Sequence, residues 1–287
     1  MRFIEYEKIV AAVEQLCIAA AHELPGDVLD ALKNAAQRES NPKAKKIIET
    51  LIENAGIAET QQIPLCQDTG ITVVFVEQGS GVAVRPPADK ADAGLYDAIN
   101  DGVRAGYENG YLRKSVVAEP LRERENTGDN LPAIIHYEQT SGDKLKLTVM
   151  TKGAGCENKS QFKMFKPTAE LNEVCEWIVG VANSAGADAC PPLIVGVGIG
   201  GNFERSCLLS KKALLRKLGT RSSDAFYARL EEDLLKQINQ SGPGPAGLGG
   251  STTALDCMIE FSPCHIASLP VAVNIECHSH RHKSIIL

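Results

Sequence analysis

The sequence predicts an α/β fold in which a mixed β-sheet core is flanked by helices and preceded by a helical N-terminal segment. Apolar residues recur at helical spacing through residues 1–60, and from residue 61 onward β-branched runs alternate with helical stretches across Gly and Pro breaks. The 287-residue chain is 44% hydrophobic and 23% charged, which is typical of a globular protein. No internal repeat or sharp boundary is visible, so we predict a single domain over residues 1–287, with 61–287 as its core.

The N-terminal part is predicted to be helical over residues 5–24, 27–37 and 42–54, with a break at the Pro-Gly pair after the first helix. The β-branched run 71–76 is then a strand that ends at the glycines of residues 79–81.

A further helix is predicted over residues 89–107, followed by a polar loop over 110–131 whose length is typical of functional loops. Residues 133–140 and 144–150 flank Ser-Gly-Asp, which indicates a hairpin.

The C-terminal half alternates helices and strands. Helices are predicted over residues 167–185, with Pro167 in the first turn, 203–218 and 224–238, and strands over 193–197, 254–261 and 269–275, with a Pro/Gly-rich loop at 241–250.

Charge and apolar patterning exclude several classes of protein. The formal net charge is −6 and no dense basic patch is present, so nucleic acid is not an expected partner. No run approaches the roughly 20 apolar residues of a membrane helix, and the N-terminus resembles neither a secretory signal nor a transit peptide. We therefore expect a cytoplasmic protein that acts on a small molecule.

Nine cysteines, an odd number, argue against a disulfide framework and favour reduced thiols. Cys17, Cys175 and Cys207 fall within helical patterns and are expected to be buried. Three other cysteines lie in turns beside β-rich runs, where each can present a thiolate to a common cleft: Cys66, Cys190 and Cys277. Three thiolates without a fourth suggest an iron–sulfur cluster with one iron left open to act as a Lewis acid.

Two other patterns suggest different chemistry. Residues 196–201 contain the GxGxxG spacing of dinucleotide-binding folds, but no strand ending in an acidic residue follows, so we interpret these glycines as backbone that approaches the Cys190 site. His278, His280 and His282 lie close to Cys277, but no CxxC motif supports a zinc site.

Several polar residues accompany the three cysteines. Asp68 lies two residues after Cys66 and can act as an acid or base, although an Asp before Gly can equally cap a turn. Residues 153–155 can bind a carboxylate or phosphate through backbone N–H groups, or can simply end the hairpin. His265 is either structural or a partner of Asp68.

Taken in order, five motifs resemble the iron–sulfur hydro-lyases, which comprise class I fumarases and L(+)-tartrate dehydratases, over almost the whole chain. These are Cys66-Gln67-Asp68-Thr69-Gly70, Lys152-Gly153-Ala154-Gly155-Cys156-Glu157-Asn158-Lys159, Ala189-Cys190-Pro191-Pro192 with Gly200-Gly201, Ser251-Thr252-Thr253-Ala254, and the segment from His265 to Cys277.

The resemblance implies roles for individual residues. Cys66, Cys190 and Cys277 would hold a [4Fe-4S] cluster. Asp68 would take part in acid–base chemistry with support from His265, Arg113 would pair with a substrate carboxylate, and Gln67 and Gly155 would also contact substrate.

In this family a further region, in the same chain or a separate one, supplies more active-site groups, so the resemblance implies an α subunit that needs a β subunit, in an α2β2-type or homodimeric assembly. The family's double Arg after the third cysteine is here Arg281-His282, which leaves the role of the tail open.

The implied activity is the reversible hydration of fumarate to (S)-malate, a step of the tricarboxylic acid cycle. L(+)-tartrate dehydration is the alternative within this class, and an iron–sulfur redox sensor is the alternative outside it. A sensor has no need of Asp68 or Arg113.

Overall fold

A computed structural model describes residues 1–287 and confirms the α/β class, with mixed sheets, flanking helices and a helical N-terminal segment. The chain folds as two compact units. Unit 1 comprises residues 1–25, 57–154 and 281–287, and unit 2 comprises residues 26–56 and 155–280. The single domain predicted over residues 1–287 stays a prediction. None of the helices is both long enough and apolar enough to span a membrane.

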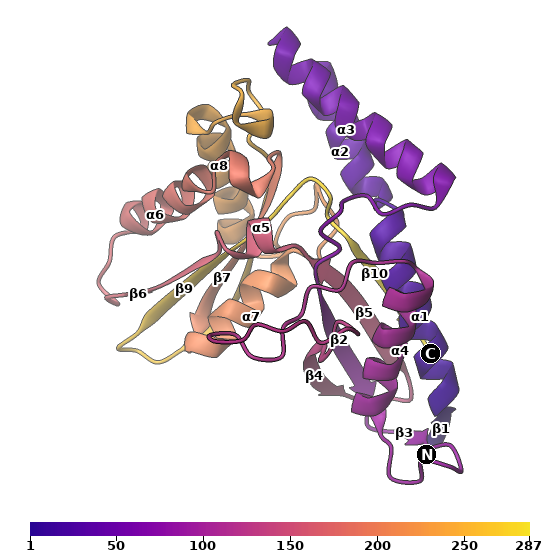
Figure 1. The fold of residues 1–287 in the computed structure, drawn as a ribbon. Helices are drawn as coiled ribbons and strands as arrows, with labels where there is room; N and C mark the ends of the chain where they lie inside the picture. The colour runs from indigo at the N-terminus through magenta and orange to yellow at the C-terminus, as the bar shows by residue number, and fades with distance from the viewer. The chain divides into compact units, whose positions relative to one another are not determined.

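Unit 1 contains a four-stranded mixed sheet in the order β10-β5-β2-β4 and a two-stranded parallel sheet of β1 and β3. Helices α1 and α4 lie side by side and contribute, with strands β2 and β5, to one apolar core (Figure 1). Its elements are β1 (Arg2–Glu5), α1 (Tyr6–His22), β2 (Ile71–Gly79), β3 (Val82–Arg85), α4 (Leu95–Asn109), β4 (Ile134–Thr140), β5 (Leu145–Lys152) and β10 (His282–Ile286).

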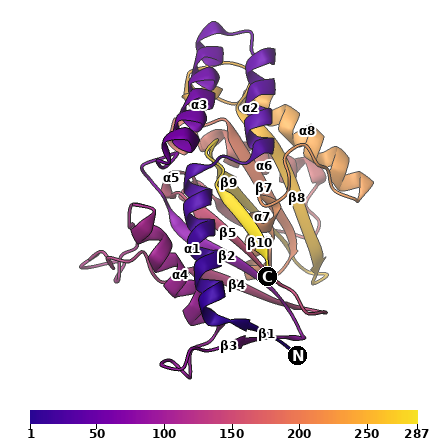
Figure 2. The ribbon, with the colours of Figure 1, turned by 90° about the vertical axis from the view of Figure 1, so that its right-hand side faces the viewer.

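Unit 2 contains a second four-stranded mixed sheet in the order β6-β9-β7-β8, with β7 and β8 parallel and α8 beside β8 (Figure 2). Its elements are α2 (Gly26–Arg38), β6 (Gln161–Phe165), α6 (Leu171–Ser184), β7 (Leu193–Gly201), α7 (Phe203–Ala213), α8 (Ala225–Ser241), β8 (Ala254–Cys264), β9 (Leu269–Glu276) and short 3₁₀ turns at Ala187–Ala189 and Pro245–Gly247. Helix α3 (Pro42–Gln61) and the short α5 (Ala154–Glu157) cross from one unit into the other.

Strand β7 receives helices on both faces, because successive side chains of a strand point to opposite sides. Val195 and Val197 join the apolar cluster formed with α6 and α8. On the opposite face a Cβ on Gly198 would stand 2.0 Å from the carbonyl oxygen of Ser206 in α7. The glycines of residues 196–198 therefore allow α7 to pack against the strand, which is a different role from the approach to the Cys190 site that the sequence suggested.

The hairpin predicted between residues 133–140 and 144–150 is wrong. Strands β4 and β5 do not pair with each other, because β2 lies between them, parallel to β4 and antiparallel to β5. The 141–143 turn instead passes over the end of β2, where Gly81 N–H donates to the carbonyl of Gly142 at 2.8 Å. Strand β2 is apolar and almost continuously buried, as expected of a central strand, whereas β4 is largely exposed at the sheet edge.

All seven predicted helices are present, but four are shorter and three are longer than predicted. The helix predicted from residue 89 begins at Leu95, the one predicted to residue 218 ends at Ala213, and the one predicted from Pro167 begins at Leu171, so Pro167 is not in its first turn. Four short strands, β1, β3, β6 and β10, were not predicted.

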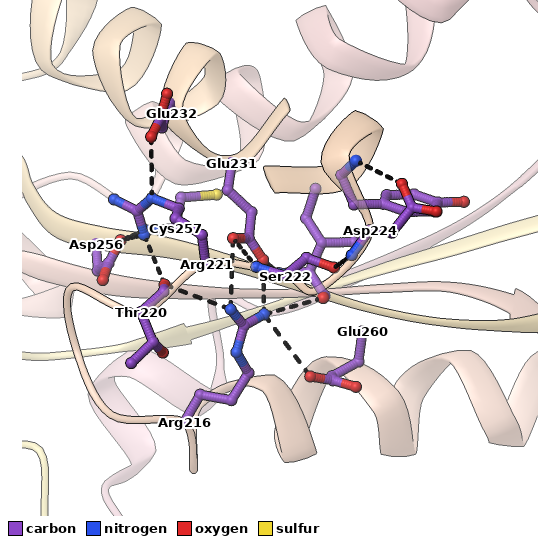
Figure 3. Close-up of polar contacts among 12 residues, drawn as sticks. Arg216, Thr220, Arg221, Ser222, Asp224, Glu231, Glu232, Asp256, Cys257 and Glu260 are labelled. Atoms are coloured by element: carbon purple, nitrogen blue, oxygen red, sulfur yellow. Dashed lines mark hydrogen bonds and ion pairs between the residues drawn. The ribbon is translucent and has the colours of Figure 1, made fainter. Parts of the chain in front are cut away.

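A buried ionic network fixes the 214–224 segment of unit 2 (Figure 3). Glu231 of α8 is fully buried and accepts hydrogen bonds from Arg216 Nη1 at 2.6 Å and from the backbone N–H groups of Ile259 at 2.8 Å and Ser222 at 2.9 Å. Both oxygens of the carboxylate therefore have hydrogen-bond partners. Through them the Glu231 side chain links α8, β8 and the 214–224 segment at one point.

Candidate active site

The loop at residues 66–70, between α3 and β2, holds Asp68 in one orientation. Its Oδ1 accepts the N–H of Gly70 at 3.1 Å, and its Oδ2 accepts the N–H of Ala154 at 2.8 Å. The first contact is the turn cap that the sequence allowed for, and the second uses the 153–155 backbone that the sequence suggested as an anion site. Each oxygen keeps a lone pair for a further hydrogen bond, so the cap does not prevent a role in proton transfer.

Arg281, in the C-terminal tail, is the second charged group at this loop. Its side chain is only 2% exposed, and Nη1 donates to the backbone carbonyl of Asp68 at 2.6 Å. A Cβ on Gly153 would stand 3.2 Å from Arg281 Nη2 and 3.3 Å from Asp68 Oδ2, so glycine leaves space where both groups meet. The buried Nε of Arg281 has no hydrogen-bond partner. The sequence left this tail without a role because an isolated Arg just before a short strand carries no motif.

The 110–131 loop is fastened to the Asp68 loop. Thr69 Oγ1 donates to the carbonyl of Arg113 at 2.7 Å, and Asn130 Nδ2 donates to the carbonyl of Gly70 at 3.2 Å. The side chains of Arg113 and Gln67 are exposed. Unit 1 therefore brings the backbone of Arg113 to the loop that carries Cys66, Gln67 and Asp68, and adds Arg281 to that loop.

In unit 2 three segments converge where β9 ends. His278 Nδ1 donates to the carbonyl of Cys190 at 2.8 Å, which joins the residues after Cys277 to the Cys190 turn. A Cβ on Gly155 would stand 3.1 Å from the carbonyl oxygen of Asp188, so the 155–159 segment lies against the same turn. Unit 2 therefore brings Gly155, Cys190 and Cys277 together.

His265 is not part of this group. It lies in the exposed turn between β8 and β9, where its Nδ1 accepts the N–H of Ala267 at 3.1 Å. Cys277 follows the opposite end of β9, and eight residues of strand separate two ends by roughly 25 Å. Within unit 2 the structure thus places His265 far from Cys190 and Cys277.

The thiols differ in their suitability as metal ligands. Cys17 and Cys257 are fully buried, and desolvation raises the pKa of the Cys17 thiol to about 12 and raises that of Cys257 as well. Burial also raises the pKa of Cys175 and Cys207.

The three predicted ligands lie in loops and reach solvent: Cys190 is exposed, and Cys66 and Cys277 are partly exposed. Cys190 also adopts the left-handed backbone conformation, φ 54°, which is uncommon outside glycine and is concentrated at functional sites. Cysteine thiolates are the ligands of iron–sulfur clusters, so these three residues have the donor chemistry that the predicted cluster requires. Cys264, also exposed, lies beside His265 at the other end of β9.

Two buried side chains next to Cys277 were missed. Sγ of Cys156, an Oε of Glu276 and Sγ of Cys277 all lie within 4.8 Å of one another, and Cys156 and Glu276 are 3% and 1% exposed. The sequence left Cys156 unassigned. Glu276 carried no signal, because an acidic residue at the end of a strand is ordinarily exposed.

Comparison with known proteins agrees with this chemistry. A sequence model of the fumarate hydratase (Fumerase) family matches residues 10–286. A Methanocaldococcus jannaschii protein provisionally named L(+)-tartrate dehydratase subunit alpha is 40% identical over 277 residues, which are 96% of this chain and 95% of that protein. The L(+)-tartrate dehydratase subunit alpha of Escherichia coli O157:H7 is 28% identical over 281 residues, which are 98% of this chain and 91% of that protein.

The chain is therefore that of a hydro-lyase, an enzyme that adds water to or removes it from its substrate. It belongs to the fumarate hydratase family.

Proposed function

We propose that this chain is the α subunit of an iron–sulfur hydro-lyase that interconverts fumarate and (S)-malate. The observation that carries the proposal is the placement of Asp68 within a family match that spans residues 10–286: its carboxylate is held by two backbone N–H groups, and its own carbonyl is held by buried Arg281. A carboxylate fixed in this way is oriented before substrate binds, which supports a role in proton transfer.

Cys66, Cys190 and Cys277 are the proposed ligands of a [4Fe-4S] cluster. A cluster with three cysteine ligands supplies a Lewis acid for the hydroxyl group of the substrate. The three side chains are the loop thiols described above, and their exposure is consistent with this use.

The protein groups provide binding and proton transfer. The exposed guanidinium of Arg113 is proposed to pair with a substrate carboxylate in a bidentate manner, and Gln67 and Gly155 to hydrogen-bond the substrate. Asp68 is proposed to move a proton through a carboxylate oxygen when water is added or removed. His265 stays a prediction that the geometry of unit 2 does not favour, since it lies at the other end of β9 from Cys277.

Two further elements of the proposal rest on the relatives. Because they are named alpha subunits, we propose that a separate β subunit completes this enzyme in an α2β2-type assembly. Because they are named for L(+)-tartrate, dehydration of that substrate is the second candidate activity. Tartrate differs from malate by one hydroxyl group.

The test is anaerobic reconstitution with iron and sulfide, with and without the candidate β subunit, followed by assays with fumarate, malate and L-tartrate. Asp68→Asn should lower turnover by at least about 100-fold while the visible absorption of the cluster is retained. Asp92→Asn, at an exposed position of unit 1, is the matched control and should keep normal turnover. Near-normal activity of Asp68→Asn would remove this residue from the mechanism, and full activity without a β subunit would refute the split site.

A further inference from the structure

Beside Cys277, unit 2 holds a group of three potential metal ligands, defined here as the Cys156 group: Cys156, Glu276 and Cys277. Cys156 Sγ donates to Glu276 Oε1 at 3.3 Å, and Cys277 Sγ donates to the same oxygen at 3.8 Å. Two thiols therefore face one carboxylate oxygen.

The burial of this group is unusual for a carboxylate. Glu276 is 1% exposed and forms the last residue of β9, opposite Ile194 of β7. A buried carboxylate is costly unless it is hydrogen-bonded, paired with a cation or bound to a metal. The hydrogen-bond donors to its Oε1 include the two thiols and the backbone N–H of Cys277, at 3.2 Å. Two thiols and a carboxylate become strong ligands of a divalent cation once the thiol protons leave.

The spacing agrees with a tetrahedral metal site. Zinc–sulfur bonds of about 2.3 Å and zinc–oxygen bonds of about 2.0 Å, at tetrahedral angles, separate sulfur from oxygen by about 3.5 Å and two sulfurs by about 3.8 Å. The two observed sulfur–oxygen separations, 3.3 and 3.8 Å, bracket that value. The sulfurs lie within 4.8 Å of each other, so they need approach by no more than about 1 Å.

The surrounding backbone holds the ligands in place. Ser160 Oγ accepts the N–H of Ile275 at 3.1 Å, which fixes the segment after α5 against the end of β9. Lys159 Nζ pairs with Asp188 at 3.1 Å and fixes the same segment to the Cys190 turn. Cys156 and Glu276 thus come from two segments that are joined by the Ser160–Ile275 hydrogen bond and by the pairing of β6 with β9 directly after it, as a preorganised site requires.

We propose that the Cys156 group binds a single divalent transition-metal ion, Zn²⁺ or Fe²⁺, in the chain that lacks its cluster. Binding releases two thiol protons to solvent, and the metal is held by two thiolates and one carboxylate, with water as the fourth ligand. Borderline-soft cations suit this mixture of sulfur and oxygen, whereas Mg²⁺ and Ca²⁺, which prefer oxygen ligands alone, do not.

The site has a consequence for cluster assembly, and this consequence rests on the proposed function. Cys277 is both a member of the Cys156 group and a proposed cluster ligand, and one thiolate cannot serve the mononuclear ion and the complete cluster together. Bound zinc therefore competes with cluster assembly, and Cys156 determines how strongly it competes.

The experiment uses Zn²⁺ alone, added anaerobically to the full chain after chelator treatment in the presence of a non-thiol reductant. Zinc-edge X-ray absorption should show two sulfur ligands at about 2.3 Å. Three sulfur ligands would place the ion on Cys66, Cys190 and Cys277 instead and would overturn the assignment, and this measurement on the unaltered chain does not depend on whether a variant folds.

Affinity is measured by competition with a chromophoric chelator. Cys156→Ser and Glu276→Gln should each weaken zinc binding, Cys156→Ser by at least about 100-fold, which exceeds the 10–100-fold loss typical of groups that only support a metal ligand. Cys264→Ser, which alters an exposed thiol at the other end of β9, is the matched control and should bind as tightly as the unaltered chain. Unchanged affinity in Cys156→Ser would refute the site.

Competition is measured separately, as iron incorporated during reconstitution with and without one equivalent of zinc. Zinc should slow iron uptake in the unaltered chain and have little effect in Cys156→Ser. If the unaltered chain binds zinc through two sulfurs but takes up iron equally fast, the competition is refuted while the cation site stands. If it takes up no iron under any condition, the proposed function fails instead.

Discussion

Glu231→Gln tests whether the buried ionic network holds unit 2 together. The replacement keeps the shape of the side chain but removes its charge and exchanges one oxygen for an NH₂ group. In the folded protein the two oxygens accept hydrogen bonds from Arg216, Ser222 and Ile259 (Figure 3). The new NH₂ group must therefore face at least one donor.

The magnitude follows from the burial of both partners. The side chain of Glu231 is fully buried and that of Arg216 is 18% exposed, so in the variant the guanidinium keeps only the longer, more exposed pair with Glu260, at 3.7 Å, in a largely dry environment. Breaking such a pair from one side costs about 3–5 kcal/mol, which is a large part of the 5–15 kcal/mol that stabilises a typical domain. Glu232→Gln is the matched control: its side chain is 65% exposed and 3.8 Å from Arg221, so the change should cost less than about 0.5 kcal/mol.

The assay is urea unfolding under reducing conditions, followed by fluorescence of Trp177, the one tryptophan of the chain. It lies in α6 of unit 2 and packs edge-on against Phe165, with ring centroids 5.6 Å apart, so it reports on the unit that is changed. Equal midpoints for Glu231→Gln and Glu232→Gln would refute the reasoning, because they would show that burial adds nothing to this carboxylate.

Three further predictions concern other parts of the chain. Arg281→Lys should lower turnover at least about tenfold with no loss of bound iron, measured side by side, because a lysine cannot reproduce the planar contacts of the guanidinium beside Asp68. Burial opposes ionisation of Asp101, but hydrogen bonds from a tyrosine, a lysine and an arginine outweigh it and lower its pKa to about 2. Its contribution to stability is therefore present above the unfolded pKa of about 3.9 and is lost as the pH falls toward 2. When the free energy of unfolding is measured against pH, Asp101→Asn should therefore lose less stability between about pH 4 and pH 2 than the unaltered chain. Gly198→Ala should destabilise unit 2 by at least about 2 kcal/mol in the urea assay, since its Cβ would overlap the Ser206 carbonyl, and a smaller loss would mean that α7 moves away.

The sequence predicted those parts of the fold that depend on local pattern. Strand β2 and helices α1 and α8 follow from β-branched or helically spaced apolar residues, and Asp224 caps α8 by accepting the N–H of Phe226. The pairing of β4 was wrong because it depends on a distant strand: a three-residue turn suits a hairpin locally, but the buried β2 takes both neighbours.

The candidate site shows the same division. Asp68 and the loop cysteines were recognisable because each lies in a short motif with Gly or Pro, whose backbone requirements are local. Arg281 and Glu276 were not recognisable, because their roles arise from burial against segments more than 100 residues away, Arg281 beside Asp68 and Glu276 beside Cys156. His265 lies close to Cys277 in sequence, but the eight residues of β9 separate the two, and its proposed role stays a prediction.

The central claim is that three loop thiols hold a [4Fe-4S] cluster, and the most direct measurement is the iron and sulfide content of the anaerobically reconstituted chain. We predict about four irons per chain in the unaltered protein and in Cys264→Ser, and a large loss in Cys66→Ser, Cys190→Ser and Cys277→Ser. Less than one iron per unaltered chain, or full iron content in any of the last three variants, would contradict the account.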